Sequence, residues 1–170
     1  MHESAVIAAI ALGSNEGDRL GTLRRAVEEI EQEGLLHEPR WSDAFETPPE
    51  SAGDGGAFLN AAGVGRTTLE PPALLQALLR IEARLGRVRP PGARGGPRTI
   101  DLDLILHGER VIDQPGLQLP HPRFDSRAFV LVPLAQIAPD LREPRAGRPL
   151  HSLLADLGPI ALPRVGSLRK

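Results

Sequence analysis

The sequence predicts an α+β fold with a ferredoxin-like βαββαβ core, in which helices pack on an antiparallel sheet and further elements are added at the C-terminus. Four short segments have the apolar patterns of strands, and two longer segments repeat apolar residues at helical spacing. They follow one another in the order strand, helix, strand, strand, helix, strand. We therefore expect both helices on one face of the sheet and a ligand on the other face.

The composition favours one domain in a reducing compartment. The chain has 170 residues, enough to bury a core, and it contains no cysteine. We expect a single domain over residues 1–170 with a loose tail at 164–170. We expect it in the cytoplasm, because no apolar run has the length of a membrane span and the N-terminal residues lack a basic signal segment. The net charge of −2 gives no general attraction to nucleic acid or membranes. Lys170 is the only lysine, so anion chemistry depends on arginine.

The first strand and the first helix are predicted within residues 5–34. Residues 5–12 are apolar on both faces, as in a strand in the middle of a sheet. Residues 13–18 form a turn without a phosphate-binding glycine motif, and Asp18 or a neighbour caps the helix that follows. The helix ends at Gly34. Its apolar stripe contains Leu20, Leu23, Val27 and Ile30.

A less regular second strand is predicted within residues 35–46 and a third at 58–64. Residues 47–50 contain two prolines and are expected to be extended or turned. Phe58 and Asn60 share one face of the third strand. An aromatic ring beside an amide suits a flat heterocycle, although a core phenylalanine beside a hydrogen-bonded asparagine gives the same pattern.

The second helix is predicted from Pro71 to Gly86, with Glu82 at the border of its apolar stripe. Residues 88–97 then contain three prolines and three glycines among arginines, which excludes regular structure. A long basic loop of this kind is typical of a lid over a ligand. Residues 83–100 contain five arginines and no acid: Arg84, Arg87, Arg89, Arg94 and Arg98.

The fourth strand carries the central motif. Alternation places Asp101 and Asp103 on one face, roughly 6.5 Å apart. The opposite face carries Ile100, Leu102, Leu104 and Leu106. Two carboxylates at this spacing repel each other unless a cation lies between them, so the motif predicts a divalent metal. The solvated face of an ordinary amphipathic strand would give the same alternation, and the preceding arginines favour a metal-bound polyphosphate.

The remaining residues predict shorter elements. After a turn at 107–110 we expect a short strand around 111–112, and residues 119–122 are extended and present His121. Residues 125–127 can form one helical turn, and residues 129–137 form an apolar segment broken at Pro133. A last short helix is predicted at 150–157.

Several motifs together resemble the 6-hydroxymethyl-7,8-dihydropterin pyrophosphokinase family. The most specific is the run Gly-Pro-Arg-Thr-x-Asp-x-Asp at residues 96–103. The other similar segments lie at residues 8–15, 47–49, 58–62, 81–82, 86–87, 119–121, 127–129, 133–134 and 137–139. The chain departs from the family at Gly95, where some members carry tryptophan, at Phe58, where tyrosine is familiar, and at Pro122, where an aromatic residue can occur.

The resemblance implies transfer of the β,γ-diphosphate of ATP, with two Mg²⁺ ions, to the hydroxymethyl group of the reduced pterin, with release of AMP. It implies that Asp101 and Asp103 hold both metal ions and that Arg87 and Arg98 stabilise charge on the moving phosphoryl groups. The implied nucleotide contacts are Glu82, Arg89, Arg94, Arg98, Leu104, His121 and Arg127. The implied pterin contacts are Thr47, Pro48, Glu50, Phe58, Asn60 and Phe129.

Two other classes of protein compete with this interpretation. A ferredoxin-like RNA-binding module would need exposed aromatic residues on its sheet and usually a basic surface. A regulatory module would bind a nucleotide without chemistry and would have little use for both Arg87 and Arg98 beside the metal. We expect ATP and the reduced pterin as the partners, no nucleic acid or membrane, and a monomer or at most a weak homo-oligomer.

Overall fold

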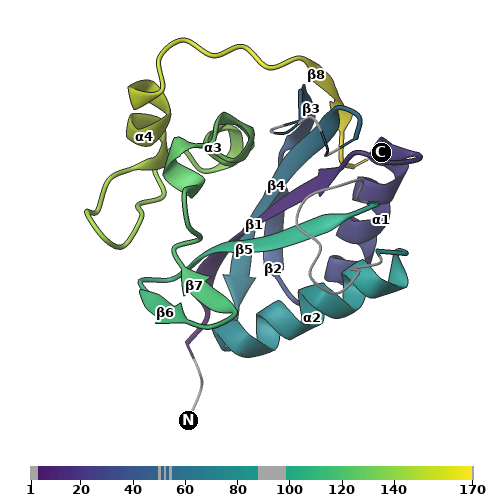
Figure 1. Cartoon of the computed structure of the whole chain (residues 1–170). Helices are drawn as coiled ribbons and strands as arrows, with labels where there is room; N and C mark the ends of the chain where they lie inside the picture. The colour runs from purple at the N-terminus through teal and green to yellow at the C-terminus, as the bar shows by residue number, and fades with distance from the viewer. Residues whose placement is uncertain (1–3, 50, 52, 54, 88–98, 170) are drawn as a thin grey trace.

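The computed structural model describes residues 4–49, 51, 53, 55–87 and 99–169. This part of the chain is a mixed α/β structure with an antiparallel sheet and four α-helices (Figure 1). The elements are β1 (Val6–Ser14), α1 (Arg19–Gln32), β2 (His37–Trp41), β3 (Asp43–Thr47), β4 (Phe58–Thr67), α2 (Pro71–Arg84), β5 (Asp101–His107), β6 (Ile112–Gln114), β7 (Leu117–Leu119), a 3₁₀ turn (Phe124–Ser126), α3 (Ala128–Ile137), α4 (Leu150–Asp156) and β8 (Arg164–Ser167). None of the helices in these ranges has the length and apolarity needed to cross a bilayer.

The elements form three layers (Figure 1). The six-stranded sheet has the order β5-β1-β4-β3-β8, with β2 also paired to β4, and β6 and β7 form a separate hairpin. Helices α1 and α2 cover one face of the sheet, and α3 and α4 lie on the other face. Each face therefore has its own apolar core: the first core lies on the side of α1 and α2, and the second core lies on the side of α3 and α4. The expectation that the second face would be left for the ligand is only partly correct.

The first two helices begin and end where the sequence predicts. The Asp18 carboxylate accepts a hydrogen bond from the backbone N–H of Gly21 at 3.0 Å and caps α1. Pro71 occupies the first turn of α2, and Gly34 and Gly86 follow the two helices with φ of 65° and 93°. Burial of their apolar stripes stabilises the first core by about 1.5–3 kcal/mol for each fully buried leucine or isoleucine.

The predicted second strand is two strands, because one extra residue interrupts its pairing with β4. Trp41 pairs with Gly63, whereas Phe45 pairs with Asn60, so the chain from 41 to 45 is one residue longer than the strand it pairs with. The extra residue is accommodated at Ser42, whose hydroxyl accepts a hydrogen bond from the Ala62 N–H at 2.8 Å. The ladder is therefore broken between β2 and β3 while the backbone remains hydrogen-bonded.

The prediction of a loose tail at 164–170 is wrong for the residues that the structure describes. Residues 164–167 form β8, which pairs antiparallel with β3 at the edge of the sheet. The side chain of Leu168 is buried in the first core, and Arg24 donates hydrogen bonds to the carbonyl of Ser167 at 2.9 and 3.1 Å. Proline and arginine near the end of the chain obscured this strand, because its pairing partner lies more than a hundred residues earlier.

Two further expectations need correction. Leu106 does not share the face of Leu102 and Leu104, because β5 contains one extra residue relative to β1 between Leu104 and Leu106. Leu106 therefore joins the second core. In addition, Pro133 does not break the segment 129–137, since α3 continues through it. Burial of the apolar residues of α3 outweighs the proline penalty of about 3 kcal/mol.

Candidate active site

The second face of the sheet is divided between an apolar half and a polar half. Three cross-strand rows run over β4, β1 and β5 on this face: Asn60–Gly13–Asp101, Ala62–Ala11–Asp103 and Val64–Ala9–Leu106. The third row is buried in the second core beneath α3 and α4. The first two rows carry the polar side chains, and all of their residues except Ala62 line a pocket. The site thus lies where the strands continue beyond the covering helices.

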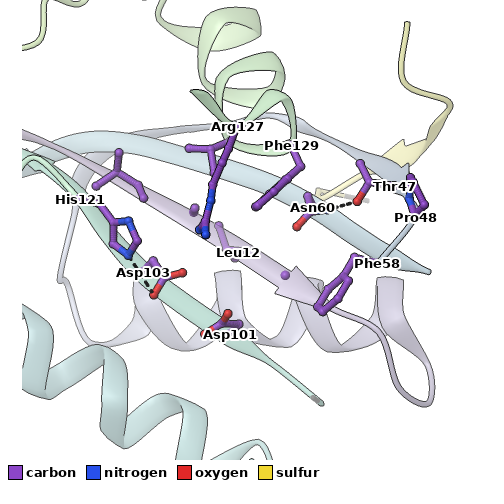
Figure 2. A pocket seen from close by; sticks show the side chains of 14 residues that line it. Leu12, Thr47, Pro48, Phe58, Asn60, Asp101, Asp103, His121, Arg127 and Phe129 are labelled. Atoms are coloured by element: carbon purple, nitrogen blue, oxygen red, sulfur yellow. Dashed lines mark hydrogen bonds and ion pairs between the residues drawn. The ribbon is translucent and has the colours of Figure 1, made fainter. Parts of the chain in front are cut away.

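This pocket brings together most of the predicted site residues that the structure describes (Figure 2). Its predicted members are Thr47, Pro48, Phe58, Asn60, Asp101, Asp103, His121, Arg127 and Phe129. It is completed by residues that the sequence did not single out: Ala11, Leu12, Gly13, Ile105 and Val130. The pairing of β1 with β4 and β5 was the missing information, because it places Gly13 directly between Asn60 and Asp101.

One end of the pocket has two aromatic side chains beside a buried amide. Phe58 and Phe129 are both in its wall (Figure 2). Between them lies Asn60, which is 7% exposed and whose Nδ2 donates to Thr47 Oγ1 at 2.6 Å. This bond fixes the amide so that its oxygen lies on the side of Gly13. A Cβ atom added at Gly13 would lie 3.2 Å from this oxygen, Asn60 Oδ1. The arrangement offers aromatic faces together with an oriented hydrogen-bonding group.

The Phe129 ring is held by Arg127. The Arg127 guanidinium carbon lies 5.4 Å from the ring centroid, within the range of a cation–π interaction. Both residues lie at the start of α3 and line the pocket. The guanidinium therefore brings positive charge to the pocket while it orients the aromatic wall.

The other end of the pocket carries the two carboxylates. Asp101 and Asp103 both line the pocket, as the alternation predicts, and their side chains are 20% and 41% exposed. Arg87 does not line the pocket. Its Nη1 lies 2.5 Å from Asp101 Oδ1 and also donates to the Ile100 carbonyl at 3.1 Å. Arg87 thus compensates part of the negative charge and orients Asp101.

Glu82 lies beneath this end of the site. Its side chain is 2% exposed, and Oε2 accepts a hydrogen bond from the Leu102 N–H at 3.0 Å. Oε1 lies 3.6 Å from Arg87 Nη1. Glu82 and Arg87 therefore connect the end of α2 to the start of β5, the strand segment that bears both aspartates. Glu82 is not among the residues that line the pocket.

His121 stands beside Asp103, with its Nε2 4.0 Å from Asp103 Oδ1 (Figure 2). Burial lowers the pKa of His121, and the charges of Arg127 and Arg123 lower it further. The carbonyl of Pro122, to which Nδ1 is hydrogen-bonded at 3.0 Å, and the charge of Asp101 oppose this shift only in part. The imidazole is therefore neutral at neutral pH.

A second groove adjoins the pocket at Asp103 and His121, which line both cavities. Leu104, which is 4% exposed, lies in the wall of this groove. The rest of the groove is formed by Leu75 and by residues 113–118 and 122–123. Two cavities thus meet at the carboxylate end of the pocket.

The carboxylates fit a magnesium site that a ligand completes. No group of three or more potential metal ligands occurs among residues 4–49, 55–87 and 99–169. Mg²⁺ is usually bound by one or two carboxylates together with phosphate oxygens and water, and Asp101 and Asp103 supply that number. Glu50, Arg89, Arg94 and Arg98 lie outside the described residues, as does the predicted lid at 88–97.

Comparison with known proteins shows which family the chain is similar to. The model of the family described as 7,8-dihydro-6-hydroxymethylpterin-pyrophosphokinase matches residues 9–139. A protein of Methylorubrum extorquens named 2-amino-4-hydroxy-6-hydroxymethyldihydropteridine pyrophosphokinase is 42% identical over 158 residues, which are 93% of this chain and 98% of that protein. A protein of Bacillus subtilis with the same name is 45% identical over 131 residues, 77% of each chain.

Solved structures show the same fold at low sequence identity. The crystal structure of wild-type Plasmodium falciparum HPPK-DHPS matches with a TM-score of 0.70 at 13% identity. The match covers 91% of this chain and 45% of the solved chain, so this chain spans less than half of that protein. With the family model and the bacterial relatives, the chain belongs to the 7,8-dihydro-6-hydroxymethylpterin-pyrophosphokinase family.

Proposed function

We propose that Asp101 and Asp103 bind the triphosphate of ATP through magnesium and that the adjoining pocket binds the reduced pterin. The reaction is that of the family: the chain is an ATP-dependent diphosphotransferase of folate biosynthesis. It transfers the β,γ-diphosphate of ATP to the hydroxymethyl group of 6-hydroxymethyl-7,8-dihydropterin and releases AMP. One observation carries the assignment of residues: both carboxylates line the pocket, and Asp103 also lines the adjoining groove.

The pterin is assigned to the end of the pocket between Phe58 and Phe129. A flat heterocycle gains from stacking on aromatic faces, and Asn60, oriented by Thr47, can hydrogen-bond its edge. Pro48 and Glu50 follow Thr47, and we assign them to the same edge of the ring. The hydroxymethyl group would then point toward the carboxylates, where the phosphoryl groups arrive.

The nucleotide is assigned to the groove beside Leu104. His121 lies at the junction of the two cavities and Arg127 in the pocket wall, which supports our assignment of both to contacts with the phosphates. Arg87 and Arg98 are proposed to stabilise charge on the transferred group, and Arg89 and Arg94 to act from a lid over it. We assign Glu82 to this site as a support, because its carboxylate holds both Arg87 and the backbone of β5.

Two magnesium ions are proposed at Asp101 and Asp103. When bound, they would supply neutralisation of the triphosphate charge and a lower pKa for the pterin hydroxyl group. The chain itself contributes orientation. Arg87 holds one oxygen of Asp101, and the pairing of β5 with β1 holds both aspartates on the pocket face.

We further infer a ferredoxin-like core. The order β1, α1, β2/β3, β4, α2, β5 is that of a βαββαβ unit once β2 and β3 are counted as one interrupted strand, and both helices cover one face. The pairing of β8 with β3 supports a single domain. A monomer is also proposed, since only three large hydrophobic side chains are exposed among the described residues: Val111, Ile160 and Val165.

Removal of either carboxylate tests the metal assignment. We expect Asp103→Asn and Asp101→Asn to lower AMP release from ATP and pterin by about a hundredfold or more, because the metal contributes several kcal/mol to stabilisation of transition-state charge. AMP release is measured by chromatography, and circular dichroism checks the fold. Asp140→Asn is the control, since the Asp140 side chain is 94% exposed and does not line the pocket. Turnover at the wild-type rate in both aspartate variants would contradict the assignment.

A further inference from the structure

The wall of the proposed pterin pocket comes from the two ends of one loop. Residues 48–57 connect β3 to β4, whose ladder here consists of three pairs: Phe45–Asn60, Glu46–Leu59 and Thr47–Phe58. Thr47 and Pro48 enter the loop on one side, and Phe58 leaves it on the other side. The width of this end of the pocket therefore depends on how firmly the last pair of the ladder is held.

Arg19 binds both strands at this position. Its Nη1 donates a hydrogen bond to the carbonyl of Ala57 at 2.9 Å, and its Nη2 donates to Glu46 Oε2 at 3.2 Å. Ala57 directly precedes Phe58, and Glu46 directly precedes Thr47. One guanidinium group thus connects the residues next to both pocket-lining positions.

The same contacts tie the loop to the rest of the fold. Arg19 is the first residue of α1, and α1 is anchored in the first core by Leu23 and Val27. A second link comes from Asn15, whose Nδ2 donates to the carbonyl of Gly56 at 3.4 Å. The segment between β1 and α1 therefore holds the end of the loop from outside the pocket.

The chemistry of this contact requires arginine. A planar guanidinium presents donors in a fixed fork and can serve a carboxylate and a carbonyl at once, whereas the ammonium group of lysine is a single point of charge. Arg19 is 28% exposed in its side chain and Glu46 is 41% exposed, so the ion pair by itself contributes little in water. The value of the contact lies in the geometry that it imposes on two neighbouring strands.

We propose that Arg19 is a positioning residue for the pterin: it keeps Thr47 and Phe58 at the separation that the ring requires. Arg19 does not line the pocket, so it acts through the residues that do. The inference rests on the proposed binding of the pterin at this end of the pocket. It assigns to Arg19 a selective effect on pterin binding, with no effect on the nucleotide groove, because none of the residues held by Arg19 lines that groove.

Arg19→Met removes both hydrogen bonds and keeps the aliphatic stem. We expect the KM and the Kd for the pterin to rise about tenfold, as for the loss of one or two hydrogen bonds, while the KM for ATP stays within about twofold of the wild type. Steady-state kinetics gives both KM values, and titration of pterin without ATP gives the Kd. Arg19→Lys should recover only part of the affinity for the pterin.

Arg84→Met is the matched control. Arg84 of α2 also forms ion pairs, with Glu29 of α1 and with Glu33, the residue that follows α1, but neither it nor its partners line the pocket. This variant should lower the melting temperature about as much as Arg19→Met and leave both KM values unchanged. The positioning role is supported if Arg19→Met loses more affinity for the pterin than Arg84→Met while the two variants have similar melting temperatures.

Three results would overturn the inference while the proposed function stands: an unchanged pterin Kd in Arg19→Met, a parallel rise of the KM values for pterin and ATP, or full recovery in Arg19→Lys. The proposed function fails in a different way. In that case the wild-type chain itself neither binds the pterin at this pocket nor releases AMP.

Discussion

At the scale of single residues, the pocket depends on a position without a side chain. Gly13 lies in β1 between Asn60 and Asp101 and lines the pocket. A Cβ atom at this position would lie 3.2 Å from Asn60 Oδ1 and 3.7 Å from Phe58 Cδ1. The residue has no left-handed conformation that would require glycine. The close approach of the Asn60 side chain at this pocket-lining position therefore explains the glycine better than backbone geometry.

Gly13→Ala tests this explanation. We expect the KM for the pterin to rise roughly tenfold, because the new methyl group narrows the space that the ring enters and disturbs the oriented amide of Asn60. Alanine in place of glycine within a strand otherwise favours folding by about 0.5–1 kcal/mol. Kinetics combined with thermal unfolding should therefore show weaker pterin binding without loss of stability.

Gly166→Ala in β8 is the control for this prediction, because a Cβ atom there would approach only the flexible ends of two side chains, Leu20 at 3.3 Å and Arg24 at 4.0 Å. It should leave the KM for the pterin unchanged. If Gly13→Ala bound the pterin as tightly as the wild type, the glycine would have no role in the shape of the pocket.

At the scale of elements, Asp43 connects three parts of the fold that surround the site. It begins β3, its Oδ2 lies 2.6 Å from Arg164 Nε of β8, and it exchanges hydrogen bonds with the Gln136 side chain of α3. The end of β3 and the start of α3 both carry pocket residues. Asp43 therefore holds the edge of the sheet to the helix that covers the second face.

We expect Asp43→Ala to lower the free energy of unfolding by about 1–2 kcal/mol at pH 7, because the charge-assisted hydrogen bonds of the carboxylate with Arg164 and Gln136 are lost. The hydrogen bond with Arg164 is the main cause that lowers the pKa of Asp43 below its usual 3.8. Its contribution to stability is therefore complete above pH 3.8 and is lost as the pH falls through the lower pKa of the folded state. The difference in free energy of unfolding between Asp43→Ala and the wild type should therefore decrease below about pH 4.

Urea titrations at pH 7 and at pH 3 measure this difference. The exposed Asp140 offers a control variant, Asp140→Ala, which should be close to the wild type at both pH values. If the difference in free energy of unfolding between Asp43→Ala and the wild type stayed constant down to pH 3, the ionised carboxylate of Asp43 would not stabilise β8.

At the scale of the whole molecule, the three layers decide where a ligand can bind. The first face of the sheet is covered by α1 and α2, and the apolar half of the second face is covered by α3 and α4. The uncovered half has polar side chains on β4 and β5 with small residues of β1 between them. The open part of the sheet is therefore also the part that can bind a charged ligand.

A ligand that joins elements of several layers should stabilise the whole molecule. At MgATP concentrations a hundredfold above Kd, we expect a gain of about 2.7 kcal/mol, or an increase of roughly 5–10 °C in Tm. An excess of EDTA should remove most of this gain, because the triphosphate then lacks the cation between it and the carboxylates. Asp103→Asn should show the same loss with magnesium present. An unchanged Tm gain in EDTA would contradict a metal-dependent nucleotide site.

The sequence by itself determined whatever depends on near neighbours. Alternation places Asp101 and Asp103 on one face, helical spacing and caps define α1 and α2, and the run at 96–103 indicates the family. It also predicted that Phe58 and Asn60 share a face, and the structure places both in the pocket.

Only the tertiary structure decided what depends on pairing between distant segments. The position of Gly13 between Asn60 and Asp101 and the strand β8 need partners far away in the sequence. The ion pair of Arg87 with Asp101 joins residues that no local periodicity relates. One extra residue in β5 moved Leu106 to the other face, and no local pattern contains that register. The physical reason is that local periodicity specifies which side of a strand a residue takes, whereas the strand opposite it is selected by burial and hydrogen bonding over the whole chain.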